Sequence, residues 1–139
     1  MGGRDSGSLR AALTVSDLVI IPVAPRSFDV WGVRQTLDII EEVRELHPEL
    51  RALAVLNGAD SAGNRNQEAV EALAEFGGLQ VSPHALVRRT AYAAAADEGL
   101  SVIEHIDPRN RPGSLKARED FTRFFQSVYT QFERRKLIA

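Results

Sequence analysis

Residues 18–23, with the sequence LVIIPV, and residues 52–56, with the sequence ALAVL, decide the fold of this chain. Neither run contains a polar or charged side chain. Short runs that are apolar at every position are typical of parallel strands, which helices cover on both faces. The residues between the two runs have helical spacing, so this part of the sequence predicts a strand–helix–strand unit of an α/β protein.

The predicted helix between the two strands has an apolar stripe. The stripe passes through Leu37 and Ile40, and either Val43 or Leu46 continues it. We expect Asp29 to cap the start of this helix, because a carboxylate can accept hydrogen bonds from the free N–H groups of a first turn.

The rest of the chain continues the alternation. We expect a helix from about 67 to 76, a short strand at 79–81 and a helix from about 90 to 98. The apolar residues at 100–104 read as a further strand or extended segment. After a loop rich in proline and glycine, Ser114 is expected to cap a long last helix. The predicted fold class is therefore α/β, with a doubly wound, mainly parallel sheet and helices on both faces.

Composition restricts the class of protein. A chain of 139 residues with 44% hydrophobic and 26% charged residues is expected to form one globular domain over residues 1–139. It has no cysteine, which excludes disulfides and thiolate chemistry. Neither a signal peptide nor a membrane-spanning run is recognisable, so we expect a cytoplasmic protein.

Charge is distributed unevenly. The formal net charge is −2, yet residues 105–139 carry eight Lys plus Arg and only four Asp plus Glu. A basic segment of this kind suits a phosphate backbone, although a solvated helix face has the same composition. The sequence contains neither GxxxxGK[ST] nor GxGxxG, and its three histidines have no metal-ligand spacing.

Four landmarks, in order, carry a resemblance to a known family. They are GGRDSG at 2–7, SDLVIIPVAP at 16–25, LAVLNGAD at 53–60 and AYAAAADEGLSVIE at 91–104. The chain resembles the second half of the ParA/MinD-type partition ATPases, especially the plasmid-type ParA proteins. The resemblance covers nearly all of the chain and implies a P-loop NTPase-like fold whose N-terminal half is missing.

The resemblance also implies what the chain lacks. In the family, a P-loop with lysine residues and a switch-loop aspartate hold ATP and Mg²⁺, and neither motif is found in these residues. We therefore expect no bound cofactor and no autonomous ATPase activity.

Some of the family's nucleotide-binding residues have counterparts here. By the resemblance, Asn57 would read the adenine edge, with Asp60 completing an N-x-x-D spacing, and Val87 stands where the family often has a proline beside the base. Gly2 and Gly3 would match the switch-loop glycines near the γ-phosphate. Without the resemblance, Asn57 and Asp60 read as an ordinary turn at the end of a strand.

DNA is the second ligand that the resemblance implies, bound by basic side chains without sequence preference. The candidate residues for this contact are Arg88, Arg89, Arg109, Arg111, Lys116, Arg118 and Arg123, with Arg134, Arg135 and Lys136 adding three more charges. For each of them, a solubilising surface role is the alternative.

The sequence thus predicts a truncated ParA-like protein of plasmid or chromosome segregation. Two alternatives stay open: a fragment of an active ParA-like ATPase, and a protein-interaction module. The expected partners are a second copy of the chain, non-specific DNA and a ParA-like or ParB-like protein, with no membrane. Binding to DNA would extend the cytoplasmic localisation to the nucleoid. The expected dimer contact is pairing of the strand edge at 18–23, or exchange of a helix.

Overall fold

A computed structural model describes residues 7–138 of the chain, with side-chain surroundings for residues 7–130. Helices and strands alternate through most of this length, as the sequence predicts. In chain order the elements are α1 (Gly7–Val15), β1 (Leu18–Val23), α2 (Ser27–Arg44), β2 (Arg51–Ala59), α3 (Arg65–Ala74), β3 (Gln80–Val81), β4 (Leu86–Val87), α4 (Thr90–Asp97) and α5 (Arg111–Ile138).

The sheet is built around β2, which pairs in parallel with each of the other three strands. β1 pairs with β2 along the whole length of β1, from Leu18 opposite Arg51 to Val23 opposite Leu56. β3 and β4 pair with successive parts of β2. The prediction of an α/β fold with a parallel sheet is confirmed.

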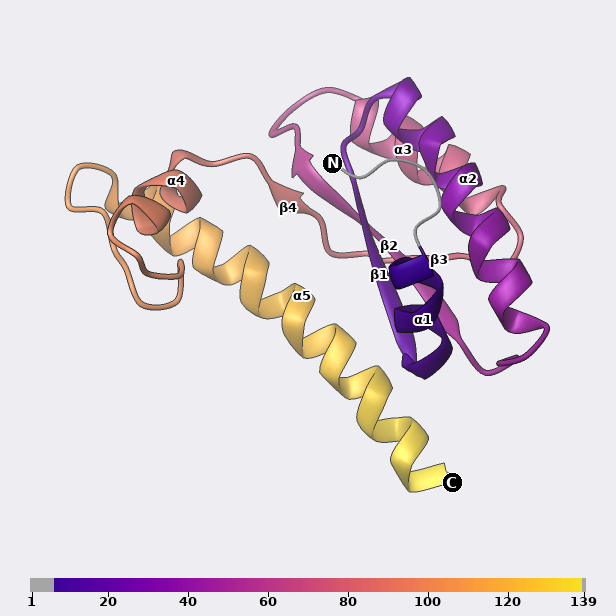
Figure 1. Ribbon diagram of the computed structural model, residues 1–139. Helices are drawn as coiled ribbons and strands as arrows, with labels where there is room; N and C mark the ends of the chain where they lie inside the picture. The colour runs from indigo at the N-terminus through magenta and orange to yellow at the C-terminus, as the bar shows by residue number, and fades with distance from the viewer. Residues whose placement is uncertain (1–6, 139) are drawn as a thin grey trace.

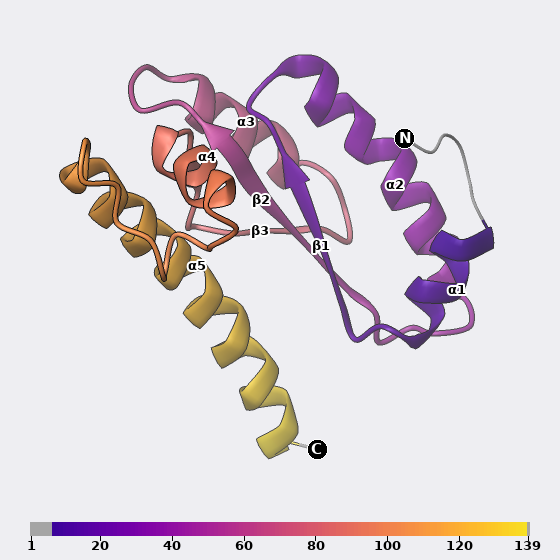
Figure 2. The ribbon, with the colours of Figure 1, turned by 60° about the vertical axis from the view of Figure 1, so that its left-hand side comes forward.

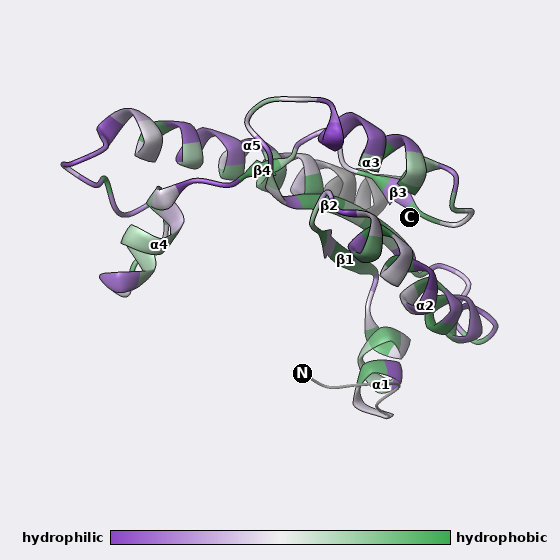
Figure 3. Ribbon diagram, turned by 90° about the horizontal axis from the view of Figure 1, so that it is seen from above, coloured by the Kyte–Doolittle hydropathy of each residue, from purple (hydrophilic) through white to green (hydrophobic). Residues whose placement is uncertain are grey.

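Helices lie on both sides of this sheet. Figures 1 and 2 show α2 and α3 together on one side and α5 crossing on the other, with α4 packed near the start of α5. Hydrophobic colour is strongest along β1 and β2, whereas α5 carries bands of hydrophilic colour (Figure 3). The main core lies between the sheet and the α2–α3 layer, and it includes buried side chains from β1, β2, α2 and α3.

The two strands of the strand–helix–strand unit, β1 and β2, differ in burial. In β2, every residue from 52 to 56 is buried, as predicted. In β1, Ile21 and Val23 are buried, but Ile20 is 41% exposed and Pro22 is exposed. The prediction that both faces of residues 18–23 are covered is therefore wrong, because only the face of β1 toward α2 and α3 packs into the core and the face with Ile20 and Pro22 stays exposed.

The helix α2 shows which residue continues the apolar stripe, and it does not start with the cap that the sequence predicts. Val43 is buried while Leu46 is 87% exposed, so Val43 continues the stripe. The helix begins at Ser27 after an extended Arg26, and Asp29 lies within the first turn and not at the cap. There its charge still favours the positive end of the helix dipole.

Residues 100–104 form a turn and no strand. Glu104 accepts hydrogen bonds from both the backbone N–H and the hydroxyl of Ser101, at 3.0 Å each, and this closes the segment on itself. Val102 is buried in a second core cluster with Ala91, Ala95 and other residues of the α4–α5 unit. The apolar residues that suggested a strand thus pack from a turn.

The last helix starts earlier than expected. Asn110, not Ser114, caps α5: its Oδ1 accepts the N–H of Gly113 at 3.1 Å, and its carbonyl accepts the N–H of Ser114 at 3.1 Å. A Cβ on Gly113 would lie 2.4 Å from the Asn110 side chain, so glycine leaves room for this cap. Ser114 is buried, and its hydroxyl accepts the N–H of Asp107 at 3.0 Å.

Further along α5, Phe121, Phe125 and Tyr129 form a stacked series with ring centroids 6.4 Å apart. Phe125 is 58% and Tyr129 is 54% exposed, so these two rings are only partly packed against the rest of the fold. No helix in residues 7–138 is long and apolar enough to span a bilayer.

Candidate functional site

Three parallel strands end at one edge of the sheet, where open α/β sheets bind ligands. Val23 lies opposite Leu56, so the segments that follow β1 and β2 leave the sheet side by side. β4 reaches the same edge, with Asn57 opposite Leu86 and Ala59 opposite Val87. The Arg88 N–H then donates to the Ala59 carbonyl at 2.9 Å.

An ion pair ties the ends of β1 and β2 together. Both terminal nitrogens of Arg26 donate to Asp60, each to a different carboxylate oxygen, at 3.1 Å. The Arg26 guanidinium also donates to the Pro25 carbonyl at 2.8 Å. Hydrogen bonds from Arg26 hold the pKa of the Asp60 carboxyl below its ordinary value, and the charges of Arg65 and Arg88 act in the same direction.

The loop after β2 is closed by a side-chain amide. Asn66 Oδ1 accepts the N–H of Asp60 at 3.0 Å, and Asn66 Nδ2 donates to the Asp60 carbonyl at 2.7 Å. The loop between them turns at Gly63, whose φ of +87° suits glycine. Asp60 is thus fixed by both its backbone and its side chain.

The predicted nucleotide-binding residues lie partly together. Asn57 is exposed at the end of β2, one strand away from the half-buried Val87. Asp60 lies three residues beyond Asn57, but its carboxylate already pairs with Arg26. Gly2 and Gly3 lie outside the described residues. Nucleotide contact by any of these residues stays a prediction.

Several of the predicted DNA-binding residues have partners within the fold. Arg89 pairs with Asp120 of α5 at 3.1 Å, and both side chains are about one-fifth exposed, 22% and 20%. Arg118 Nε donates to the Val102 carbonyl at 3.3 Å. Arg123 pairs with Glu119 one turn earlier on α5. Arg89 and Arg118 therefore hold α5 in place.

The remaining candidates are more accessible, and they lie in two places. Arg88 is exposed near the strand ends. Arg109, whose side chain is 88% exposed, lies in the loop before α5, and Arg111 and Lys116 are exposed in the first turns of α5. The side chains of Arg134, Arg135 and Lys136 lie outside the described surroundings.

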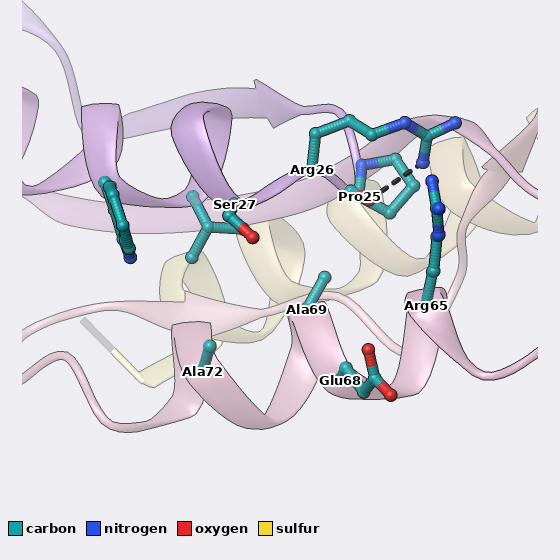
Figure 4. Close-up of a pocket in the computed structure, with 9 residues that line it drawn as sticks. Pro25, Arg26, Ser27, Arg65, Glu68, Ala69 and Ala72 are labelled. Carbon is teal, nitrogen blue, oxygen red and sulfur yellow. Dashed lines mark hydrogen bonds between the residues drawn. The ribbon is translucent and has the colours of Figure 1, made fainter.

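A cleft between α2 and α3 was not expected from the sequence. It has a volume of about 320 Å³ and is lined by the first turns of both helices, including Arg26, Ser27, Trp31, Arg65 and Glu68. Figure 4 shows the Arg26 and Arg65 side chains reaching toward one another at one end, with Ala69 and Ala72 along the α3 wall. No spacing in the sequence links Arg26 to Arg65, since their proximity comes from the parallel pairing of β1 and β2.

Comparison with known proteins gives one informative match. The chain is 34% identical over 88 residues to the maintenance of carboxysome distribution protein A of Halothiobacillus neapolitanus. This partial match supports a ParA-family relationship. It covers 63% of this chain and 40% of the relative, so the chain spans less than half of the relative's length. No protein-family model matches the chain.

Proposed function

We propose that the chain is a ParA-like protein that acts in the segregation or positioning of an intracellular cargo. The observation that carries this proposal is the 34% identity over 88 residues to a protein named for carboxysome distribution. The parallel sheet with helices on both sides, and the four sequence landmarks in family order, add support.

The 139 residues on their own are proposed not to hydrolyse ATP. The exposed Asn57 amide suits the edge of a base, since it offers both a donor and an acceptor. The sequence offers no comparable candidate for binding the phosphates, because it contains no GxxxxGK[ST] motif. The family's ATP and Mg²⁺ are therefore only partly matched: the base has a candidate contact and the phosphates have none in residues 7–138.

Titration calorimetry with Mg-ATP tests this point. Contact with the base alone predicts a dissociation constant of about 1 mM or weaker. Asn57→Ala should weaken any residual binding without changing the Tm, because Asn57 is exposed. Micromolar binding to the 139-residue chain would contradict this proposal. The predicted loss of the N-terminal half is checked by the genomic sequence upstream of residue 1.

DNA binding is proposed for the accessible basic residues before and within α5, namely Arg109, Arg111, Lys116 and Arg123. Such contacts bind phosphates and carry no sequence information. Affinity for duplex DNA should fall steeply between about 50 and about 200 mM salt, with a slope set by the number of phosphates contacted.

Fluorescence anisotropy of a labelled duplex measures this salt dependence. Lys116→Gln should lower the slope of log affinity against log salt by about one. Arg65→Gln, which removes a positive charge on α3, is the matched control and should leave the slope unchanged. Equal effects of the two variants would mean that only net charge matters and that α5 forms no DNA surface.

A homodimer is proposed through the free edge of β1 or through exchange of a helix. In the described part of the chain β1 pairs only with β2, and Ile20 is 41% exposed beside that edge. Pro22 lacks an N–H but leaves its carbonyl available. Light scattering should give twice the chain mass of 15.3 kDa, and Ile20→Lys should restore the monomer. A wild-type protein that is monomeric at every concentration would contradict the proposal.

A further inference from the structure

The cleft between α2 and α3 is separate from the residues expected to meet a nucleotide. Leu56 belongs to the core under α2 and α3. Successive side chains of a strand point to opposite faces, so Asn57 is turned to the other face of the sheet. The cleft lies on the α2–α3 side, where Ser27 of α2 faces Ala69 and Ala72 of α3 across the space between the helices (Figure 4).

At one end of the cleft, one guanidinium is paired and a second is not. The Arg26 and Arg65 side chains reach toward one another (Figure 4), and Arg26 takes both carboxylate oxygens of Asp60. Within residues 7–130, no hydrogen bond or ion pair engages the Arg65 side chain. Arg65 is therefore available to bind an incoming carboxylate, which prefers a guanidinium partner.

Three carboxylates near this end of the cleft work against such binding: Asp60 and Asp29, whose charges act on Arg26, and Glu68. Glu68 lines the cleft one turn further along α3, on the same wall as Arg65. Its carboxylate has no ion pair with Arg65 in the described residues, so it lowers the positive potential without occupying the guanidinium. Removing this charge should strengthen the binding of an anion, and this provides an independent test.

An exposed aromatic pair stands on α2. Trp31 lines the cleft and is 65% exposed, and Phe28 stands beside it at 83% exposed, with ring centroids 5.7 Å apart in an edge-on contact. Phe28 does not line the cleft, so a small ligand inside the cleft would leave it uncovered. Tryptophan and arginine are both enriched among the residues that dominate protein–protein interfaces.

We propose that the cleft between α2 and α3 binds a short segment of a partner protein in which an acidic residue lies next to an apolar one. The carboxylate pairs with the Arg65 guanidinium, and the apolar side chain packs against Trp31 and Phe28. This binding site does not depend on the ParA relationship or on DNA binding.

The chain offers its own reporter for this binding, because Trp31 is its only tryptophan. The probes are blocked hexapeptides without tryptophan, each with one Asp or Glu beside one Leu or Phe, and each paired with the same peptide carrying Asn or Gln. Acidic peptides should shift the Trp31 emission to shorter wavelength. Their neutral partners should bind about tenfold more weakly, as expected when one charge-assisted hydrogen bond is lost.

Variants then separate the cleft from general charge effects. Arg65→Gln should weaken the acidic peptides about tenfold, and Glu68→Gln should strengthen them a few-fold. Lys116→Gln, which removes one positive charge on α5, is the matched control and should have no effect. Calorimetry on Trp31→Ala should show loss of binding, and circular dichroism should show that each variant keeps its helices.

Three results would overturn the proposal. Acidic and neutral peptides could bind equally, Arg65→Gln and Lys116→Gln could weaken binding equally, or inorganic phosphate alone could produce the full Trp31 shift. The last result would assign the cleft to a small anion. None of these readouts involves ATP or DNA, so failure here is distinct from failure of the proposed function.

Discussion

Ser114 provides the sharpest test of how α5 begins. It is 1% exposed, and its hydroxyl accepts the N–H of Asp107, itself in a residue that is 8% exposed. In Ser114→Ala that buried N–H loses its acceptor, which costs about 1–3 kcal/mol, while the better helix propensity of alanine returns about 0.5 kcal/mol. The net loss is about 0.5–2.5 kcal/mol, or a Tm lower by roughly 2–10 °C.

Ser114→Asp separates this geometry from a capping role. Aspartate is as good a cap as serine, so a serine at the cap position would tolerate the change. At a buried position within the helix, a carboxylate loses its hydration, and we expect a larger loss than with alanine. Urea denaturation followed by circular dichroism measures both variants, with Ser127→Ala as a control on the same helix. A Ser114→Asp protein as stable as wild type would refute the reasoning.

Three further changes test other parts of the fold. Gly99 has a φ of +69°, so Gly99→Ala should introduce backbone strain that lowers the free energy of unfolding by about 1 kcal/mol and lowers the Tm. Gly32 lies on α2 with open space around it, so Gly32→Ala should raise the free energy of unfolding by about 1 kcal/mol and raise the Tm. Arg26 lowers the pKa of Asp60, so this pair stabilises the fold above the ordinary pKa of 3.8, and that stability is lost as pH falls through the lowered pKa. The urea midpoint of Asp60→Asn should therefore fall less steeply in acid than that of wild type. Arg51 has buried Nε and Nη2 atoms with no partner in the described residues, so Arg51→Leu should be neutral or raise the Tm, and a drop of several degrees would contradict this.

The sequence predicts the elements whose signal is local and periodic. The apolar runs of β1 and β2 and the stripe through Leu37 and Ile40 locate the strand–helix–strand unit almost to the residue. It fails where tertiary packing decides. Apolar residues at 100–104 suit a strand, but the turn closed by Glu104 buries Val102 against α4 and α5. Ser114 looks like a cap until Asn110, four residues earlier, is found to fill that role.

The candidate site shows the same limit. Asn57 and Asp60 could be named because they follow a recognisable strand. Arg26 and Arg65 could not, since they lie 39 positions apart and meet only after two strands pair in register. A short sequence motif records neighbours along the chain, whereas this cleft depends on neighbours across the sheet.

The division of the core into two clusters has a consequence for how the molecule opens. The larger cluster is contained in residues 13–87, and the smaller one, between α4 and α5, uses only residues 91–121. The short β4 strand and the Arg89–Asp120 pair connect the two. Because the two clusters share no residue, we expect the amide hydrogens of α4 and α5 to exchange through a subglobal opening, whereas those of β2 exchange only on global unfolding. A protease that acts during such an opening would cut first in the loop at 98–110 and leave the strand–helix–strand unit intact.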